Sequence, residues 1–326
     1  MSQLKVGVIG LGNMGKHHVR NYSEIPDATL TAVCDIHSET AKACAHHYHC
    51  QAFTSLDEML SIPLDAVSIT APTRFHYDIA KKVIARGINV LIEKPIADSV
   101  EKADDLIALA KKHNVVLTVG HIERFNPAVL KLKELVDQGA LGKITSMVSK
   151  RVGAFPAQIK DANVIIDLAV HDIDIFSYLL DKQPDNVTGA AGRALNSNRE
   201  DYAEIFLNYG DQNGFIQVNW ITPIRIRTLS VTGTKGYAEL NYMTQELVLY
   251  ESNYSEDFDS FGDFIIKFGI PNKREVSLEK QEPLNLELRH FLSCIKDKKP
   301  PLISGETGRQ ALAIALDVMK MLNFKQ

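Results

Sequence analysis

Short apolar runs alternate with amphipathic segments over the first 120 residues of the chain. Five runs are apolar on both faces, at 5–10, 29–35, 66–70, 89–93 and 115–120. Strands with two apolar faces are typical of a parallel sheet that lies between two layers of helices. The segments between the runs, such as 98–114, place apolar residues at helical spacing. This alternation predicts a doubly wound α/β domain.

The pattern changes after residue 121. A helical stretch at 126–139 is followed by strand-rich segments with Gly or Asn turns, of which 209–214 is the clearest, and two amphipathic helices close the chain. We therefore predict two domains, 1–121 and 122–326. The second is expected to be α+β with a large, mostly antiparallel open sheet.

One predicted strand of the second domain bears on assembly. The run at 203–209 is nearly continuously apolar, whereas 215–222 alternates between apolar and polar positions. A sheet that contains a fully apolar strand is expected to have both faces covered. Helices can cover one face, and a second subunit is a natural cover for the other. The sequence thus predicts a homodimer or homotetramer formed through this sheet.

Composition and charge narrow the class of partner. Of 326 residues, 45% are hydrophobic and 23% charged, and the formal net charge is −4. A scattered, slightly acidic charge excludes the basic field that nucleic-acid binding needs. No secretory signal and no apolar stretch long enough for a membrane helix is found in the sequence, and there are four cysteines. We expect a cytoplasmic protein without disulfides and without a membrane partner.

A glycine motif follows the first predicted strand. Gly10, Gly12 and Gly15, with Asn13 and Met14 between them, precede a helical segment. In a βαβ unit the first glycine permits a tight turn, the second lets the backbone approach a pyrophosphate, and the third lets the helix pack against the strand. The pattern predicts a Rossmann domain that binds a dinucleotide.

Asp35 indicates which dinucleotide. It ends the second predicted strand, where a carboxylate can accept the ribose 2′-hydroxyl. The residues that follow, 36–38, include no Arg or Lys that could hold a 2′-phosphate. NAD is therefore favoured over NADP as the cofactor.

Polar residues also follow the next strands of the predicted sheet. Thr70 and Pro72, with His76 just beyond, come after the third parallel run, and Glu93 and Lys94 end the fourth. Carboxyl ends of strands are where ligands lie in open α/β sheets. A lysine at such a position is a candidate for chemistry, with an ordinary surface cation as the alternative.

A further candidate group lies at 163–174. Asp167 and His171 are four residues apart, so a helix would place them on one face, and Asp174 follows three residues later. A carboxylate beside an imidazole keeps it oriented and basic, as a proton acceptor from an alcohol requires. The alternative is a structural helix pair.

The order and spacing of these motifs resembles the Gfo/Idh/MocA oxidoreductase family. The resemblance rests on GLGNMG, APTRFH, EKP and D-x-x-x-H-x-x-D, and extends over essentially the whole chain. It implies that Lys94, Asp167 and His171 surround the reacting hydroxyl. It also implies that Glu93 and the residues around Pro72 and His76 contact the cofactor.

Segments at 119–129, 167–175, 219–223 and 231–236 further resemble the UDP-N-acetylglucosamine 3-dehydrogenases of this family. The resemblance implies NAD-dependent oxidation of a sugar C3 hydroxyl to a ketone. An inositol or free-sugar dehydrogenase with the same chemistry is the alternative, and a non-catalytic NAD-sensing regulator is an alternative of another class. Many family members have glycine where Asn163 stands, and asparagine tolerates a left-handed backbone better than most other residues do.

Three residues are candidates for contact with the substrate. A diphosphate-bearing sugar needs cations, and Arg124 and Arg151 are candidates, together with the nearby Asn126; a surface arginine paired with a carboxylate is the alternative. No metal is expected, because the cysteines and histidines of 44–50 have no second cluster at zinc spacing. The acidic, aromatic stretch 251–263 is expected to be an ordinary connection rather than a loop over the site.

Overall fold

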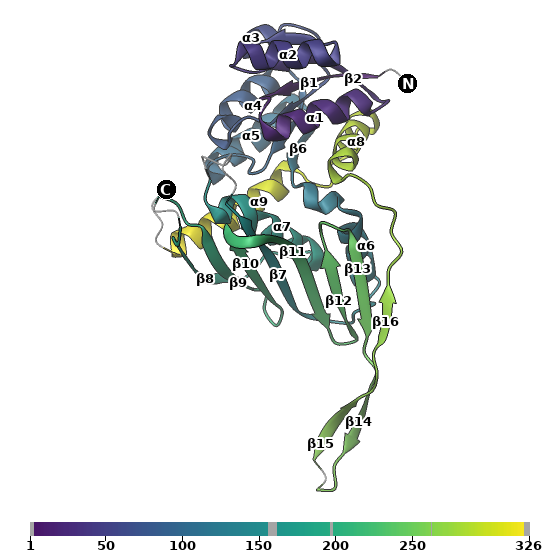
Figure 1. Cartoon of the computed structure of the whole chain (residues 1–326). Helices are drawn as coiled ribbons and strands as arrows, with labels where there is room; N and C mark the ends of the chain where they lie inside the picture. The colour runs from purple at the N-terminus through teal and green to yellow at the C-terminus, as the bar shows by residue number, and fades with distance from the viewer. Residues whose placement is uncertain (1–2, 156–161, 196–197, 262, 323–326) are drawn as a thin grey trace. The chain divides into compact units, whose positions relative to one another are not determined.

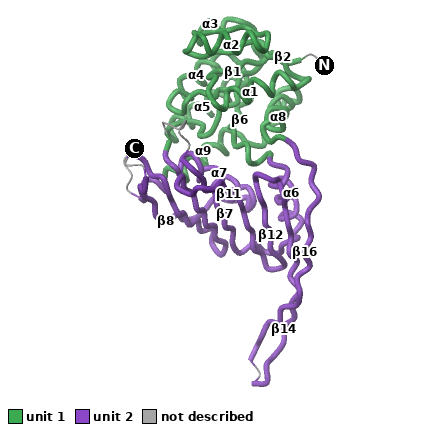
Figure 2. The backbone as a smooth tube through the Cα atoms, viewed as in Figure 1, with its two compact units in different colours: residues 1–125, 157–162, 282–316 green, residues 126–156, 163–281, 317–326 purple. Residues whose placement is uncertain are grey.

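Figure 1 shows the computed structural model of the chain, which describes residues 3–155, 162–195, 198–261 and 263–322. The chain divides into two compact units, coloured separately in Figure 2. Unit 1 comprises residues 1–125, 157–162 and 282–316, and unit 2 comprises residues 126–156, 163–281 and 317–326. None of the helices in the described ranges is long and apolar enough to cross a membrane.

Unit 1 is built on a six-stranded parallel sheet in the order β3-β2-β1-β4-β5-β6. Its strands are β1 (Leu4–Ile9), β2 (Ala28–Cys34), β3 (Gln51–Phe53), β4 (Ala66–Ile69), β5 (Asn89–Glu93) and β6 (Leu117–Gly120). The direction of winding reverses between the neighbours β1 and β4. Ligands of doubly wound sheets bind beside that reversal, at the carboxyl ends of the strands.

Helices pack on both faces of this sheet, and each face has its own apolar core. The helices are α1 (Asn13–Glu24), α2 (Ser38–Tyr48), α3 (Leu56–Met59), η1 (Thr73–Phe75), α4 (His76–Ala85), α5 (Val100–His113), η2 (Ile122–Phe125), α8 (Pro283–Asp297) and α9 (Gly305–Met321). The side chain of Ser99 caps α5 by accepting from the backbone N–H of Lys102. The predicted α/β class is confirmed.

The helix α8 joins unit 1 although it lies far along the chain. Leu284, Leu288 and Phe291 are buried in the same core as Val19 and Tyr22 of α1. Burial of this apolar face explains why unit 1 includes 282–316, whereas the sequence pattern predicts a single boundary after residue 121. Amphipathic spacing identifies a helix but does not say which sheet the helix covers.

Unit 2 contains an eight-stranded sheet in the order β16-β13-β12-β11-β7-β10-β9-β8, antiparallel except between β7 and β10. The strands are β7 (Ile144–Ala154), β8 (Asn186–Gly192), β9 (Tyr202–Asn208), β10 (Asn213–Asn219), β11 (Ile221–Gly233), β12 (Gly236–Asn241), β13 (Glu246–Glu251) and β16 (Asn272–Glu275). The predicted turn at 209–214 joins β9 to β10. The mostly antiparallel open sheet is confirmed.

One face of this sheet is covered within the unit. The helices of unit 2 are α6 (Pro127–Asp137), the π-helical turn η3 (Ile165–Ala169) and α7 (Val170–Leu180). Phe176 of α7 packs so tightly on Gly214 of β10 that a Cβ added there would lie 2.4 Å from its ring. Side chains of β9 and β10 that point to this face, such as Ile205 and Ile216, are fully buried.

The opposite face carries a half-exposed apolar row. Phe206, Phe215 and Val148 are neighbours in register on β9, β10 and β7, and their exposed fractions are 39%, 36% and 45%. The strand that the sequence shows as nearly continuously apolar therefore alternates, with Ile205 buried and Phe206 partly exposed.

The structure corrects the expectation of an ordinary connection at 251–263. Part of this stretch is β14 (Tyr254–Phe258), which pairs with β15 (Phe264–Phe268) in a separate two-stranded antiparallel sheet. Cross-strand aromatic pairs support it, because Tyr254 lies opposite Phe268 and Phe258 lies opposite Phe264. In the sequence, acidic residues close to these aromatic positions obscure the strand pattern.

Candidate functional site

The three glycines after β1 have the backbone and space that their predicted roles require. Gly10 has φ +90°, a conformation that favours glycine, and a Cβ on Gly15 would lie 2.0 Å from the carbonyl oxygen of Gly10. At Gly12, the residue that precedes α1, a Cβ would meet nothing within 4 Å. The helix N-terminus beside Gly12 is thus open to an anion, which fits the pyrophosphate of a dinucleotide.

The side chain of Asp35 is hydrogen-bonded to this turn. Its Oδ2 accepts a hydrogen bond of 2.8 Å from the backbone N–H of Leu11, and its Oδ1 accepts one of 2.9 Å from the N–H of His37. The carboxylate at the end of β2 is therefore fixed next to the glycine turn, where it would repel a 2′-phosphate.

We expect Asp35→Asn to lower the preference for NAD over NADP by roughly tenfold, because it removes the charge that repels the 2′-phosphate. The ratio of the two dissociation constants is the informative quantity, since any loosening of the turn weakens both cofactors alike. Titration of each cofactor measures it. Glu39→Gln, a change at an exposed position of α2, is the control, and an unchanged ratio in Asp35→Asn would contradict the assignment.

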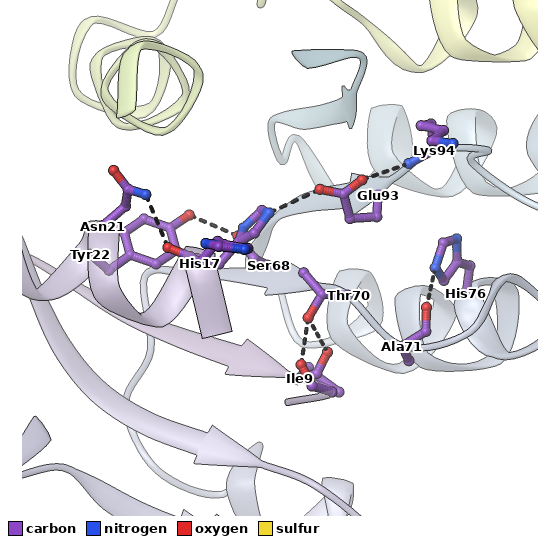
Figure 3. A network of polar contacts seen from close by, with 12 residues as sticks. Ile9, His17, Asn21, Tyr22, Ser68, Thr70, Ala71, His76, Glu93 and Lys94 are labelled. Carbon is purple, nitrogen blue, oxygen red and sulfur yellow. Dashed lines mark hydrogen bonds and ion pairs between the residues drawn. The ribbon is translucent and has the colours of Figure 1, made fainter. Parts of the chain in front are cut away.

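The loops after β4 and β5 are joined by His76, as Figure 3 shows in part. This side chain is 1% exposed, and its ring nitrogens lie 2.8 Å from the carbonyl oxygens of Ala71 and Pro95. Thr70 lies close by and donates its hydroxyl to the carbonyl oxygens of Ile9 and Gly10. His76 and Thr70 thus hold in place the three loops at the carboxyl ends of β1, β4 and β5.

Glu93 and Lys94 end β5 in the positions that the sequence indicates (Figure 3). The Nε2 atom of His18, on α1, lies 2.9 Å from Oε1 of Glu93, and both side chains are buried. Burial by itself would raise the pKa of Glu93, but the hydrogen bond from His18 and the charges of His18, Lys94 and His76 lower it below its usual value. Lys94, which is half-buried, therefore stands next to a fixed anion.

A second buried carboxyl lies within reach of Glu93, and the sequence gives no sign of it. Glu287 of α8 is 1% exposed, and neither of its oxygens has a hydrogen-bond partner in the part of the chain that the structure describes. Burial and the charge of Glu93 raise the pKa of Glu287 well above its usual value. The pKa values of the two carboxyls are thus shifted in opposite directions, with Glu93 favouring its ionised form and Glu287 its protonated form.

We expect Glu287→Gln to stabilise the protein increasingly as the pH rises above about 4.5. Unfolded Glu287 ionises there while the folded side chain keeps its proton, so the wild type loses up to roughly 1.4 kcal/mol per pH unit until its folded-state pKa is reached. The glutamine of the variant does not titrate, so the variant does not have this loss. Melting temperatures between pH 5 and pH 8 test this.

Glu282→Gln, on the residue that precedes α8, is the matched control. Burial alone would raise the pKa of Glu282, but its contacts with Asn21 and Arg20 lower it, so this carboxylate stabilises the fold above its unfolded pKa. Because the tested range lies above that value, the control should be less stable than the wild type by the same amount from pH 5 to pH 8. A constant difference between Glu287→Gln and the wild type at all pH values would show that Glu287 is ionised in the folded protein.

In unit 2, Asp167 and His171 lie on consecutive helical turns. Asp167 belongs to the π-helical turn η3 and His171 to the first turn of α7, and both are half-buried. Single π-helical turns are frequent at functional sites. Asp174 lies one turn further on and is buried. Lys94 belongs to unit 1, so its cooperation with these residues is part of the proposal below.

Asn163 caps this helical segment. Its Oδ1 accepts hydrogen bonds of 3.1 Å from the backbone N–H groups of Ile165 and Ile166, and its Nδ2 donates to Glu200. Asn163 is not among the residues with positive φ. The turn therefore needs no glycine, and the asparagine adds a cap that glycine would lack.

The predicted substrate contacts have strong partners inside the fold. The guanidinium of Arg151 binds Asp172 of α7 through two hydrogen bonds, of 2.8 and 3.1 Å, and the two residues are 4% and 0% exposed. Asn126 caps α6 and donates to the carbonyl oxygen of Tyr242. Arg124 is 8% exposed on η2.

Two family models match the chain. The one described as "Oxidoreductase family, NAD-binding Rossmann fold" covers residues 4–121, and the Gfo/Idh/MocA C-terminal domain covers residues 129–239. The first match agrees with the open glycine turn and the Asp35 carboxylate of unit 1. The second covers η3, α7 and most of the large sheet.

Individual relatives are similar over nearly the full length. The chain is 31% identical to UDP-N-acetylglucosamine 3-dehydrogenase of Acidithiobacillus ferrooxidans, over 98% of this chain and 97% of that protein. It is 29% identical to scyllo-inositol 2-dehydrogenase (NAD(+)) of Bacillus subtilis, over 93% and 89%. A solved structure of the Acidithiobacillus enzyme has a TM-score of 0.86 and 28% identity, and covers 99% of this chain and 100% of that one.

Proposed function

Because the chain belongs to the Gfo/Idh/MocA oxidoreductase family and carries its NAD-binding Rossmann domain, we propose that it oxidises the C3 hydroxyl of UDP-N-acetylglucosamine or a related nucleotide sugar to a ketone. The observation that carries this substrate is the 31% identity to a UDP-N-acetylglucosamine 3-dehydrogenase over 98% of the chain. The class of reaction, NAD-dependent oxidation of a sugar or polyol hydroxyl, follows from the family.

The proposed mechanism uses three side chains. His171 accepts the proton of the substrate hydroxyl, and Asp167 holds the imidazole in the orientation and tautomer that this requires. Lys94 stabilises the negative charge that develops on the oxygen, a preorganised contribution worth roughly 3 kcal/mol in other enzymes. When NAD is bound, it would accept the hydride from the carbon that carries this hydroxyl.

The cofactor contacts are proposed for the turn residues of unit 1. They are Gly10, Gly12, Asn13, Met14, Gly15, Asp35, Thr70, Pro72, His76, Glu93 and Lys94. Of these, His76 and Thr70 also have the positioning role described above. Support comes from the open approach at Gly12 and from the fixed carboxylate of Asp35.

An inositol dehydrogenase is the second candidate, because an inositol dehydrogenase of Bacillus subtilis is nearly as similar. A non-catalytic NAD sensor is disfavoured, since a sensor has no need of a lysine, an aspartate and a histidine in the family's catalytic positions.

Incubation of the purified protein with NAD and each sugar tests these candidates. We expect reduced cofactor, measured by its absorbance at 340 nm, with UDP-N-acetylglucosamine and little with N-acetylglucosamine or inositol. Turnover of inositol alone would favour the second candidate. Tight NAD binding without turnover of any sugar would favour the sensor.

We also propose that the protein assembles through the outer face of the eight-stranded sheet. The row of Phe206, Phe215 and Val148 supports this, because an apolar row in the middle of an uncovered face is typical of a subunit interface. Light scattering should give the mass of a dimer or tetramer, and Phe215→Glu should lower it. A wild-type protein with the mass of a monomer would contradict this proposal.

A further inference from the structure

A second arginine stands beside Arg151 in unit 2. The strands β7 and β11 are antiparallel, and their register places Arg227 directly opposite Arg151. Residues opposite each other in a sheet point to the same face. Because Arg151 binds Asp172 of α7, this is the face that α7 covers. Arg227 thus lies on the same side of the sheet as η3 and α7.

One nitrogen of the Arg227 guanidinium lacks a hydrogen bond. Its Nη1 atom is buried and has no hydrogen-bond partner within the described ranges of the chain. Burial, together with the charges of Arg151 and Arg225, lowers the pKa of Arg227 to about 10, although Asp172 and Asp167 act in the opposite direction. Asp172 already forms two hydrogen bonds with Arg151.

Arg225 adds a second cation from the same strand. It lies two residues before Arg227, at the end of an irregularity in the pairing of β11 with β7, and it is exposed. Its Cα and Cβ lie about 4 Å from where a Cβ on Gly153 of β7 would stand. Gly153 lies two residues after Arg151 on β7, so this contact places Arg225 beside the face to which Arg151 points.

This arrangement has an energetic cost in the free protein. A buried guanidinium nitrogen without a hydrogen-bond partner is destabilising, and an anion with oxygens placed to accept from it removes that cost. Arginine forms paired hydrogen bonds with phosphate more readily than lysine does. Asp167 and His171 belong to η3 and α7, so an anion bound here would lie on the same side of the sheet as the helical segment that carries them.

We propose that Arg227 and Arg225 bind the diphosphate of the substrate, so that unit 2 selects a nucleotide sugar over a free sugar. This inference rests on the proposed function and says which side chains bind the anionic part of the substrate. In this proposal Arg151 does not bind substrate but holds α7 to the sheet through its hydrogen bonds with Asp172.

Binding of UDP to the full chain, measured by calorimetry, tests the site without turnover. We expect Arg227→Met to raise the dissociation constant for UDP by roughly ten- to hundredfold and to leave NAD binding unchanged. Arg274→Met, at an exposed position of β16 in the same sheet, is the matched control and should bind UDP as the wild type does. N-acetylglucosamine, which has no phosphate, should bind both variants alike.

Stability separates this role from a structural one. Arg227→Met should melt at the same temperature as the wild type or higher, because it removes a guanidinium whose buried Nη1 atom has no hydrogen-bond partner in the described part of the chain. A large loss of stability would show that Arg227 has a structural role and would overturn the proposal. Lack of UDP binding to the wild type, or equal binding to Arg227→Met, would also overturn it.

The outcomes also distinguish the anion site from the proposed function. Arginine-dependent UDP binding without oxidation of any UDP-sugar would keep the site and refute the function. Oxidation of UDP-N-acetylglucosamine with an unchanged KM in Arg227→Met would keep the function and refute the site.

Discussion

Lys94→Ala is expected to lower kcat for the sugar substrate by roughly two to three orders of magnitude and to leave NAD binding near normal. The ammonium is needed only when negative charge develops on the substrate oxygen, so its loss affects the chemical step more than binding of the cofactor. His171→Ala should cost a similar factor, because the hydroxyl then lacks its proton acceptor. Steady-state kinetics and NAD titration measure both effects.

Lys112→Ala, at an exposed position of α5, is the control and should keep full activity. Equal loss of NAD binding and of turnover in Lys94→Ala would indicate a structural role for the lysine. Nearly unchanged turnover in His171→Ala would assign the proton to another group.

Asp172→Ala is expected to destabilise the protein by about 3 to 5 kcal/mol. It removes the carboxylate that the buried guanidinium of Arg151 binds through two hydrogen bonds, and it removes the acceptor of the Tyr242 hydroxyl. Loss of the Arg151–Asp172 pair also frees the start of α7, which carries His171. Denaturant unfolding measures the effect on stability, and activity should fall along with it.

Asp211→Ala is the matched control, because Asp211 pairs with Lys143 on the surface of the same unit. Exposed ion pairs contribute about 0 to 1 kcal/mol, so this change should be nearly neutral. Similar losses in the two variants would mean that burial of the Arg151–Asp172 pair has no particular importance.

The sequence predicts most of the fold because both sheets have strong periodic signals. The five parallel runs lie within about two residues of strands β1, β2, β4, β5 and β6, and the glycine turn has the expected geometry. The short strand β3 is missed because three residues carry no usable period. The hairpin of β14 and β15 is missed because acidic residues interrupt its aromatic positions.

The candidate site is predictable where its proposed residues are close in sequence or follow strands. Lys94 after β5, and Asp167 with His171, are of this kind. Glu287 and Arg227 are not, because their importance comes from burial beside charges that lie far along the chain, Glu93 in one case and Arg151 in the other. A helical glutamate and a strand arginine look like ordinary surface residues until the packing around them is known.

A crystal structure of the protein with NAD and UDP-N-acetylglucosamine bound tests the central claim most directly. We expect Nζ of Lys94 and a ring nitrogen of His171 to lie about 3 Å from one sugar hydroxyl, on the carbon that faces the nicotinamide. A complex in which either side chain points away from that hydroxyl would contradict the proposed chemistry.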